Sequence, residues 1–559
     1  MSNDEHESLP NHDEQETLPN TDEQELHPEA MPAPQRVAFS RRGMVASAHW
    51  EATKAGVEVL EEGGNAMDAA VATAFALGVA EPAASGIGGQ TMMLIYQTDT
   101  KVTTALDGSS RAPHRALPGL LSKKERRLGH RATTVPSTPA TLGYVSQKYG
   151  KLPLARVLEP SIRLAEEGYP ISELQRSLTE RELKSLRRGT AADLFLDKEG
   201  NPYPIGTTFQ QPVLAQTFKG IAERGIEDFY TGEIGKAMLH DMEEHGGLIH
   251  EDDLAQIPYP IERKPVGCRF EGHRIHSFPP PGAGRTLVEM LNILGHFPDH
   301  LWTPETPKGA VLLAKLIQQA FQDRQDRPFD PNFYPQTDDK QMVSEGYAKK
   351  VARRIRKQLR GHGETTHLSV VDRDGNCVAL TQSIERVYGS FCASPELGFL
   401  YNNYMSAFEY EDVSHPYYLR PGAVPWASVA PTITFRQRKP WLVIGSPGSE
   451  RITPTILQVM LRLRDQRPFD AVNAPRLHCS LSGEVSLEAS RMSTDVIEAL
   501  QEHGFTIKVR EPYSFYLGCV QLVVRERDGW RGVADPSRDG SASEPKKVRR
   551  GGCCRKAGF

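Results

Sequence analysis

The residues best suited to chemistry begin at Glu364, where the chain reads Glu-Thr-Thr-His-Leu-Ser-Val-Val-Asp-Arg-Asp-Gly-Asn. A cut between Glu364 and Thr365 would give Thr365 a free α-amino group. Such a group has a pKa of roughly 7.7–8.0, close to the pH at which a general base works best. It can take the proton of the threonine hydroxyl as the oxygen attacks an amide. The sequence therefore indicates amide chemistry at Thr365.

A β-hairpin is expected to position this threonine. Residues 366–372 and 377–384 are rich in Val, Thr, Leu and Ile, and the three residues between them end in Gly375, which suits a turn with glycine in the left-handed conformation. In that register Thr365 faces Ser383 on the neighbouring strand, with β-carbons about 4.5–5.5 Å apart. Ser383 could then hydrogen-bond to the Thr365 hydroxyl.

Alternatives to this interpretation stay open at the level of the hairpin. A two-residue turn would place Ser383 opposite Thr366 instead, because a shift of one residue changes every pairing. An ordinary exposed hairpin without chemistry would show the same pattern. His367 alternates onto the face of Thr365 and could tune the amino group, or it could be a hydrogen-bonded histidine of the core.

Segments on both sides of the hairpin strengthen the chemical interpretation. They include 62–71 (Glu-Gly-Gly-Asn-Ala-Met-Asp-Ala-Ala-Val), 81–89 (Glu-Pro-Ala-Ala-Ser-Gly-Ile-Gly-Gly), 135–139, 163–168, 230–232 and 445–452 (Gly-Ser-Pro-Gly-Ser-Glu-Arg-Ile). In this order the segments resemble the gamma-glutamyltransferase family, over roughly residues 38 to 540.

The resemblance implies an α+β fold, the four-layer αββα sandwich of N-terminal-nucleophile hydrolases. It also implies a precursor that cuts itself between Glu364 and Thr365, leaving two fragments that stay together as a heterodimer or as a dimer of such heterodimers. The expected organisation is a disordered acidic segment over 1–36, a large subunit over 37–364, a small subunit over 365–541 and a disordered basic tail over 542–559. A small-molecule amide, with water or an amine as acceptor, is the expected partner, with no cofactor, metal, nucleic acid or membrane.

An acyl-enzyme also needs donors for its oxyanion. By resemblance these are the backbone N–H groups of Gly448 and Ser449, and the second glycine usual in the family is here Ser449. A backbone donor survives this change if serine reaches the required dihedral angles. A simple turn after the strand at 441–444 is the alternative.

The positions that bind substrate in the family are where this chain departs from it. In gamma-glutamyl enzymes an arginine clamps the substrate α-carboxylate, and that position is here Ser109. The remaining contacts, an Asn, a Gln and an Asp to the α-amino group and two serines to the carboxylate, fall on Glu385, Tyr404, Ala407, Ala427 and Ser428. Most of the glutamyl clamp is therefore missing.

Two arginines could replace the lost charge. Arg111 follows Ser109 by two residues and Arg386 follows Glu385, although each could equally be a solvated or structural arginine. The charged residues Asp323, Arg324, Asp326 and Arg327 are interpreted as structural and are assigned no chemistry.

The favoured function is hydrolysis of a small carboxylate-bearing amide, such as oxamate, or of an acyl amide. A gamma-glutamyltransferase or glutathione hydrolase is the alternative enzyme. An unprocessed, non-enzymatic binding protein on the same fold is the alternative of another class.

Composition agrees with a large enzyme. The chain has 559 residues, of which 38% are hydrophobic and 25% charged, with a net charge of −5. Residues 1–30 hold ten Asp or Glu and no Lys or Arg, and they lack the basic start and apolar segment of a secretory signal. Together with seven cysteines in no paired spacing, this predicts a cytoplasmic protein with reduced thiols. A buried helix is expected over 66–80, capped by Asn65.

Overall fold

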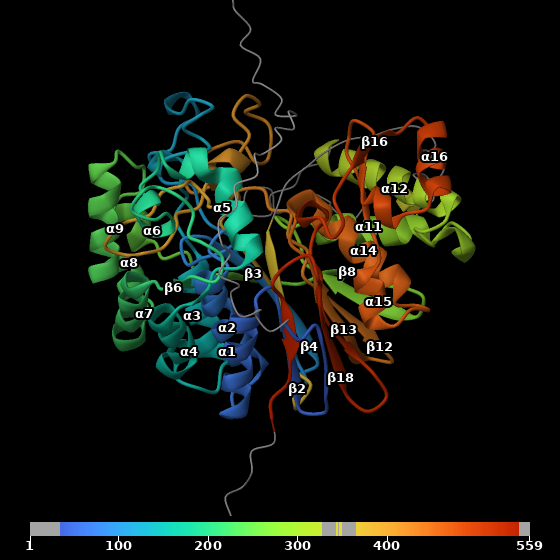
Figure 1. The fold of residues 1–559 in the computed structure, drawn as a ribbon, viewed down its shortest axis with the longest axis horizontal. Coiled ribbons are helices and arrows are strands. Elements are labelled where there is room, and N and C mark those ends of the chain that lie inside the picture. The colour runs from blue at the N-terminus through green and yellow to red at the C-terminus, as the bar shows by residue number, and fades with distance from the viewer. Residues whose placement is uncertain (1–33, 327–342, 345, 349–364, 547–559) are drawn as a thin grey trace, which may run out of the picture. The chain divides into compact units, whose positions relative to one another are not determined.

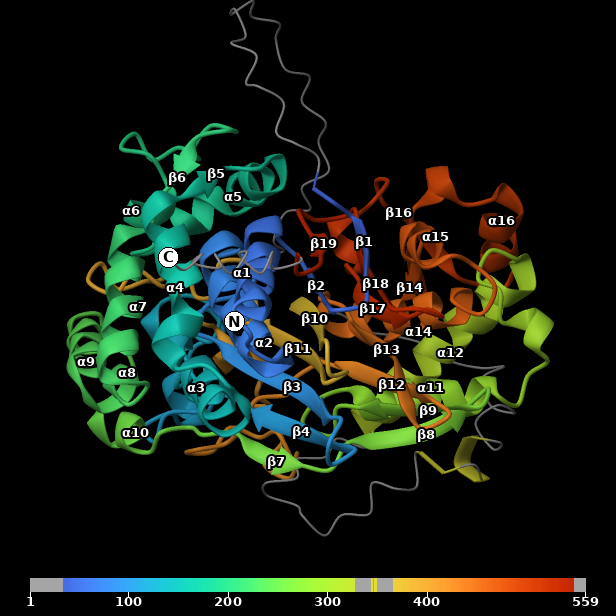
Figure 2. The same ribbon diagram turned by 90° about the horizontal axis from the view of Figure 1, so that it is seen from below.

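Two seven-stranded antiparallel sheets lie face to face at the centre of the computed structural model, which describes residues 34–326, 343–344, 346–348 and 365–546. Figure 2 shows the two sheets edge on. The first runs in the order β19 (Ser541–Ser543), β2 (Gly43–Ser47), β10 (Thr366–Asp372), β11 (Cys377–Ser383), β3 (Gln90–Gln97), β4 (Val102–Gly108), β7 (Ile261–Arg263). The second runs β1 (Val37–Ser40), β18 (Trp530–Ala534), β17 (Gln521–Arg525), β13 (Lys439–Gly445), β12 (Thr432–Arg436), β9 (His273–Ser277), β8 (Val266–Phe270).

Helices cover the outer face of each sheet (Figure 1). Against the first sheet lie α1 (Trp50–Glu61), α2 (Ala66–Ala80) and α3 (Thr138–Tyr149), and α4 (Leu154–Glu167) and α7 (Pro212–Arg224) pack outside them. Against the second lie α11 (Gly284–Leu294), α14 (Ile452–Arg462) and α15 (Pro468–Asn473), and α12 (Pro307–Asp326) and α16 (Thr494–Glu502) pack outside them. Side chains between the sheets, such as Leu94, Val371 and Val443, form one buried core, and each sheet shares another with its helices. The predicted αββα order is confirmed.

Smaller elements extend this framework. They are α5 (Glu173–Leu186), α6 (Ala192–Phe195), α8 (Asp228–Thr231), α9 (Glu233–Glu244), α10 (Glu251–Ala255), the strand pair β5 (Tyr169–Pro170) and β6 (Thr208–Phe209), and the sheet of β14 (Leu477–Cys479), β15 (Glu484–Leu487) and β16 (Thr506–Val509). No helix within the described ranges is long and apolar enough to cross a membrane.

Helix α2 occupies the span expected from the sequence. All fifteen of its residues are buried, because it packs between the first sheet and the helices α1 and α4. The Asn65 side chain caps it by accepting hydrogen bonds from the N–H groups of Met67 and Asp68. The Asp68 carboxylate in turn accepts a hydrogen bond from the Asn65 N–H. The helix ends before Glu81, and this end lies beneath the start of β10.

The hairpin of β10 and β11 has the predicted three-residue turn. Thr366 pairs with Gln382 and Val371 with Cys377, so one further step puts Thr365 opposite Ser383. Gly375 has φ of 85°, as the turn requires. The Asp372 carboxylate accepts from backbone N–H groups within the turn and from Ala66 at the start of α2. The turn is thereby fixed to the helix layer.

Both sheets take strands from each side of residue 365. In the first sheet, β10 lies between β2 and β11, and β3 lies beyond β11. The expected boundary at 541 falls inside β19, because Ser541 and Ala542 pair with β2. Order also begins before residue 37, since the Arg36 guanidinium donates to the carbonyls of Arg538 and Gly540. The predicted disordered segments, 1–36 and 542–559, therefore extend too far inward, and residues 1–33 and 547–559 lie outside the described part.

The five cysteines in the described part of the chain are free thiols, as expected. Cys377, Cys392, Cys479 and Cys519 are buried, whereas Cys268 is half-buried.

Candidate active site

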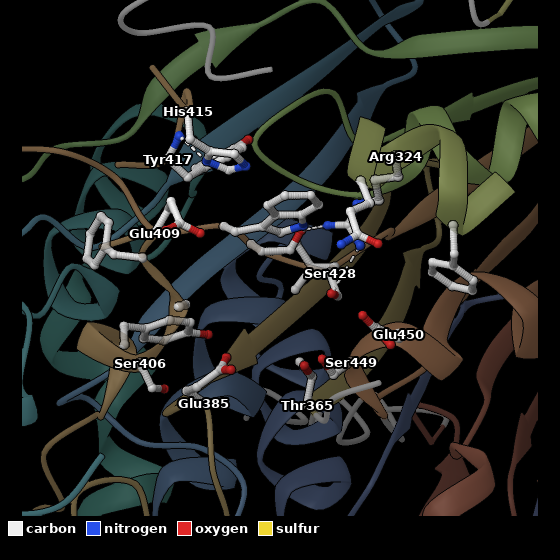
Figure 3. A pocket seen from close by; sticks show the side chains of 18 of the residues that line it. Arg324, Thr365, Glu385, Ser406, Glu409, His415, Tyr417, Ser428, Ser449 and Glu450 are labelled. Carbon is white, nitrogen blue, oxygen red and sulfur yellow. Dashed lines mark hydrogen bonds between the residues drawn. The ribbon is translucent and has the colours of Figure 1, made fainter. Parts of the chain in front are cut away.

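Thr365 lies directly before β10 and borders a cavity of about 370 Å³ (Figure 3). Side chains of β10 alternate between the helix layer, which receives Leu368, and the space between the sheets, which receives His367. Thr365 continues the face of His367 and so stands where the space between the sheets opens into the cavity. Seven candidate site positions from the sequence meet there: Thr365, Glu385, Tyr404, Ala407, Ala427, Ser428 and Ser449. Glu364 lies outside the described residues.

A buried arginine and a half-buried glutamate hold the chain at Thr365 and Thr366. The Arg538 guanidinium donates to the Thr365 carbonyl at 3.2 Å and pairs with Glu81 at 2.5 Å. Glu81 also accepts a 2.6 Å bond from the hydroxyl of Thr366. The Arg538 side chain is 1% exposed, so solvent screens this pair little. Neither residue was predicted from the sequence to contact the Thr365 region. Glu81 was interpreted only as the end of a helix, and Arg538 belongs to no recognised motif.

Ser383 has the neighbourhood predicted from the hairpin register. Its hydroxyl accepts a 2.8 Å bond from the backbone N–H of Glu385. It also interacts with the phenol of Tyr404, whose pKa burial raises well above its usual value, and this contact offsets only part of that rise. Ser383 thus links the end of β11 to the cavity wall, and its role in orienting Thr365 stays a prediction.

The loop after β13 takes a strained path at the cavity. Gly448 has φ of 114° and Ser449 has φ of 46°, so serine does adopt the left-handed conformation that favours glycine. Ser449 opens a 3-10 helix (Ser449–Arg451) that leads into α14. Strain of this kind is retained mainly at functional sites. That the two N–H groups form the oxyanion site stays a prediction.

Glu385 is a second strained residue of the cavity. Its φ is 77°, unusual for a side chain with a β-carbon, and burial raises its pKa to about 7. Glu450 lies on the other side of Thr365 from Glu385 in Figure 3 and also lines the cavity. Burial raises its pKa to about 8. The cavity therefore holds two carboxyl groups that titrate near neutral pH.

Arg324, interpreted from the sequence as a structural charge, lines the Thr365 cavity. It lies on α12 with Phe321 and Gln325, and all three line the cavity. Their spacing of three and four residues puts them on one helical face. The sequence spacing alone indicates that these residues share a helical face, but nothing in the sequence shows that this face lies near Thr365. The structural interpretation of Arg324 is therefore corrected, because its side chain borders the candidate active site.

Ser109 and Arg111 lie elsewhere. Both line a second cavity of about 390 Å³ with His114 and Tyr259, and neither is among the residues that line the Thr365 cavity. The reason is the sheet order: Ser109 follows β4, three strands from β10, which is roughly 14 Å at the usual strand spacing. Their assignment to the same substrate site is corrected.

The other proposed replacement, Arg386, is likewise not among the residues that line the Thr365 cavity. Its backbone N–H donates to Asn403 at 3.0 Å.

His367 is a core histidine. Its ring is fully buried, bonds to the hydroxyls of Thr381 and Ser369 at 2.9 and 3.1 Å, and packs on Gly445. Burial lowers its pKa to about 3, so it is neutral at physiological pH.

Within the described residues, one group of side chains is close enough together to hold a metal: His130, Asp241 and His245. The two imidazole rings, however, stack 4.4 Å apart with an angle of 8° between their planes. Ring nitrogens in two parallel planes cannot both point at one ion, so this cluster is a hydrogen-bonded structural group.

The αββα framework, with a threonine at the start of a central strand facing a cavity, defines the N-terminal-nucleophile hydrolase class. The gamma-glutamyltranspeptidase family model matches residues 52–544, and the chain belongs to that family.

Individual relatives agree with this assignment. The chain is 33% identical to the glutathione hydrolase proenzyme of Escherichia coli, over 89% of this chain and 90% of that protein. It is 32% identical to the acylase ACY 1 proenzyme of Pseudomonas sp. strain V22, over 86% and 89%. The cephalosporin acylase structure from Bacillus halodurans superposes with a TM-score of 0.85 at 28% identity, covering 94% of this chain and all of that one. The protein is therefore an amide-cleaving enzyme of this family.

Proposed function

We propose that the chain is a precursor that cuts itself between Glu364 and Thr365 and then uses Thr365 as its nucleophile. The supporting observation is the placement of Thr365: its side chain borders the cavity while Arg538 fixes its carbonyl. A nucleophile held in this way needs little reorganisation before attack. Two relatives, the glutathione hydrolase of Escherichia coli and the acylase ACY 1 of Pseudomonas sp., are named as proenzymes, which favours the same processing here.

The proposed reaction proceeds through an ester of Thr365. The hydroxyl oxygen attacks the substrate carbonyl as the α-amino group takes its proton, and that proton passes to the departing amine. The backbone N–H groups at Gly448 and Ser449 stabilise the oxyanion. Water or an amine acceptor then attacks the ester, which returns the proton to Thr365 and releases the acyl group.

The proposed substrate is a small carboxylate-bearing amide, such as oxamate, or an acyl amide. Support comes from the cavity wall, where Tyr404 and Ala407 stand at positions that hold an amino-acid head in gamma-glutamyl enzymes. Ser109, at the position of the carboxylate-binding arginine, lines the other cavity and carries no charge.

A gamma-glutamyl activity is the second candidate, and Glu385 is the observation that favours it. Its carboxyl group lines the Thr365 cavity and could accept hydrogen bonds from a substrate ammonium group. Similarity to a glutathione hydrolase proenzyme favours the same candidate.

Processing and substrate choice are tested on the same purified protein. Denaturing gels should show two fragments, and the shorter should begin Thr-Thr-His-Leu. Thr365→Ala should abolish both cutting and amidase activity. A Thr365→Ala chain that still cuts itself would show that the nucleophile is misassigned.

A side-by-side assay with glutathione, a γ-glutamyl anilide, oxamate and a glutaryl amide then separates the two enzyme candidates. We expect turnover of oxamate or the glutaryl amide and little release from the γ-glutamyl anilide. Efficient γ-glutamyl transfer would overturn the favoured substrate.

A further inference from the structure

Arg324 carries a buried positive charge whose hydrogen bonds in the described part of the molecule go to neutral groups, while the nearby carboxyl group of Glu450 interacts with it electrostatically. The residue is 7% exposed. Its guanidinium donates to the Ala427 carbonyl at 2.6 Å and to the Ser428 hydroxyl at 3.3 Å, and it lies 4.7 Å from the centre of the Trp426 ring. A buried charge is costly unless a counter-charge meets it.

Because Arg324 lies at the cavity wall, an anion bound in the cavity could supply that counter-charge. Ser428 and Trp426 line the cavity together with Arg324, so the contacts that hold the guanidinium also hold it at the cavity wall (Figure 3). Glu450 faces the same space, but burial raises its pKa to about 8, so this carboxyl is mainly neutral at pH 7. Among the described residues Arg324 forms no ion pair within 4 Å, and its hydrogen bonds go to Ala427 and Ser428, so an entering anion would be its first direct counter-charge.

A guanidinium suits one kind of anion especially well. Its planar fork matches a carboxylate in two parallel hydrogen bonds. The Ser428 hydroxyl, already bonded to Arg324, can turn to donate a further bond to the same anion. The volume of about 370 Å³ that Arg324 shares with Thr365 suits a short molecule able to touch both.

We propose that Arg324 and Ser428 bind the free carboxylate of a dicarboxylic acid monoamide while Thr365 attacks the amide at its other end. This inference rests on the proposed function and narrows its substrate class. The carboxylate belongs to the acyl part, so Arg324 holds the substrate through formation and hydrolysis of the ester. The leaving amine carries no part of this recognition. Arg324 thereby takes the carboxylate-binding role that was expected of Arg111 or Arg386.

Two chromogenic substrates test the proposal: glutaryl 4-nitroanilide, which carries the carboxylate, and pentanoyl 4-nitroanilide, which has the same chain length without it. Arg324→Met should lower kcat/KM for the glutaryl substrate by about 10- to 100-fold and change that for the pentanoyl substrate by less than about threefold. Arg111→Met, in the second cavity, is the matched control and should leave the ratio of the two substrates unchanged. An equal loss on both substrates in matured Arg324→Met would overturn the proposal.

Binding measurements keep the test independent of turnover and of the folding of one variant. Glutarate should bind the wild-type protein in calorimetry, neutral pentanediamide should bind much more weakly, and Arg324→Lys should weaken glutarate binding because lysine lacks the planar fork. Equal affinity for glutarate and pentanediamide would contradict the proposal. The protein could bind glutarate through Arg324 and yet cut neither itself nor any amide. That result would support the anion site and refute the proposed function.

Discussion

Burial moves several ionisable side chains around Thr365 toward neutral pH. The pKa of Glu385 is raised to about 7 and that of Glu450 to about 8, whereas burial lowers the pKa of Arg324 only to about 10. Glu409, also in the lining, has a lowered pKa because backbone N–H groups bond to its carboxylate, so it is ionised throughout the neutral range. His415 has a lowered pKa through burial and is mainly neutral.

This arrangement predicts a pH dependence for anion binding. Between pH 6.5 and 9, Glu385 and Glu450 lose their protons while Arg324 keeps its charge, so these carboxyls make the cavity more negative by up to two charges. The α-amino group of matured Thr365 adds one more as it deprotonates near its usual pKa of roughly 7.7–8.0. The affinity for glutarate should fall by about tenfold over this range. Calorimetry at several pH values measures it, and the double variant Glu385→Gln with Glu450→Gln should show a clearly flatter profile. A profile that is unchanged in the double variant would assign the titration to other groups.

Ser383 is predicted to act as a positioning residue for Thr365. Ser383→Ala removes the hydroxyl that the hairpin register places opposite the nucleophile, so self-cleavage should slow about tenfold or more while the fold persists. The time course of precursor disappearance on denaturing gels measures the effect. Ser383→Thr keeps the hydroxyl and serves as the control. Normal maturation of the alanine variant would show that the Ser383 side chain serves the Glu385 backbone alone.

At the scale of elements, the loop between β13 and α14 combines strain with its proposed role. Ser449 has φ of 46°, and a left-handed residue with a β-carbon costs roughly 1–2 kcal/mol. Ser449→Gly should therefore raise the free energy of unfolding by about 1 kcal/mol while activity stays within about threefold, because a backbone donor survives the change. Thermal unfolding and kcat/KM of the matured protein measure both.

A serine close by provides the matched control for this loop. Ser446 donates to the Pro447 carbonyl and accepts from the Cys519 N–H, and its φ is not positive. Ser446→Gly should destabilise the protein, because it loses these bonds and gains backbone freedom. A large loss of activity in Ser449→Gly would show that the Ser449 hydroxyl itself takes part in the reaction.

At the scale of the whole molecule, the strand order of the sheets predicts that the two fragments stay together after a cut at residue 365. Strands β10 and β11, after the cut, lie between β2 and β3, before it. Each fragment alone would expose open sheet edges and apolar faces. The two fragments should therefore elute together in native size-exclusion chromatography and separate only in strong denaturant. Separate elution under native conditions would contradict the interleaved arrangement.

Features that depend on local pattern could be predicted from the sequence alone. The hairpin register followed from Gly375 and the residue types around it, because side chains alternate strictly along strands. Helix α2 followed from Asn65 and the apolar run up to Glu81, because capping and burial are local signals. The resemblance to the family predicted the αββα layers and seven of the residues that meet at the cavity.

The charges that share the cavity with Thr365 could be identified only from the tertiary structure. Arg111 was close in sequence to a binding position but lies at another cavity, whereas Arg324 lies on a helix of the opposite layer. Glu81 and Arg538 meet beneath Thr365 although 457 residues separate them. Strand order, layer stacking and side-chain length set such distances, and these depend on contacts between residues remote in the chain.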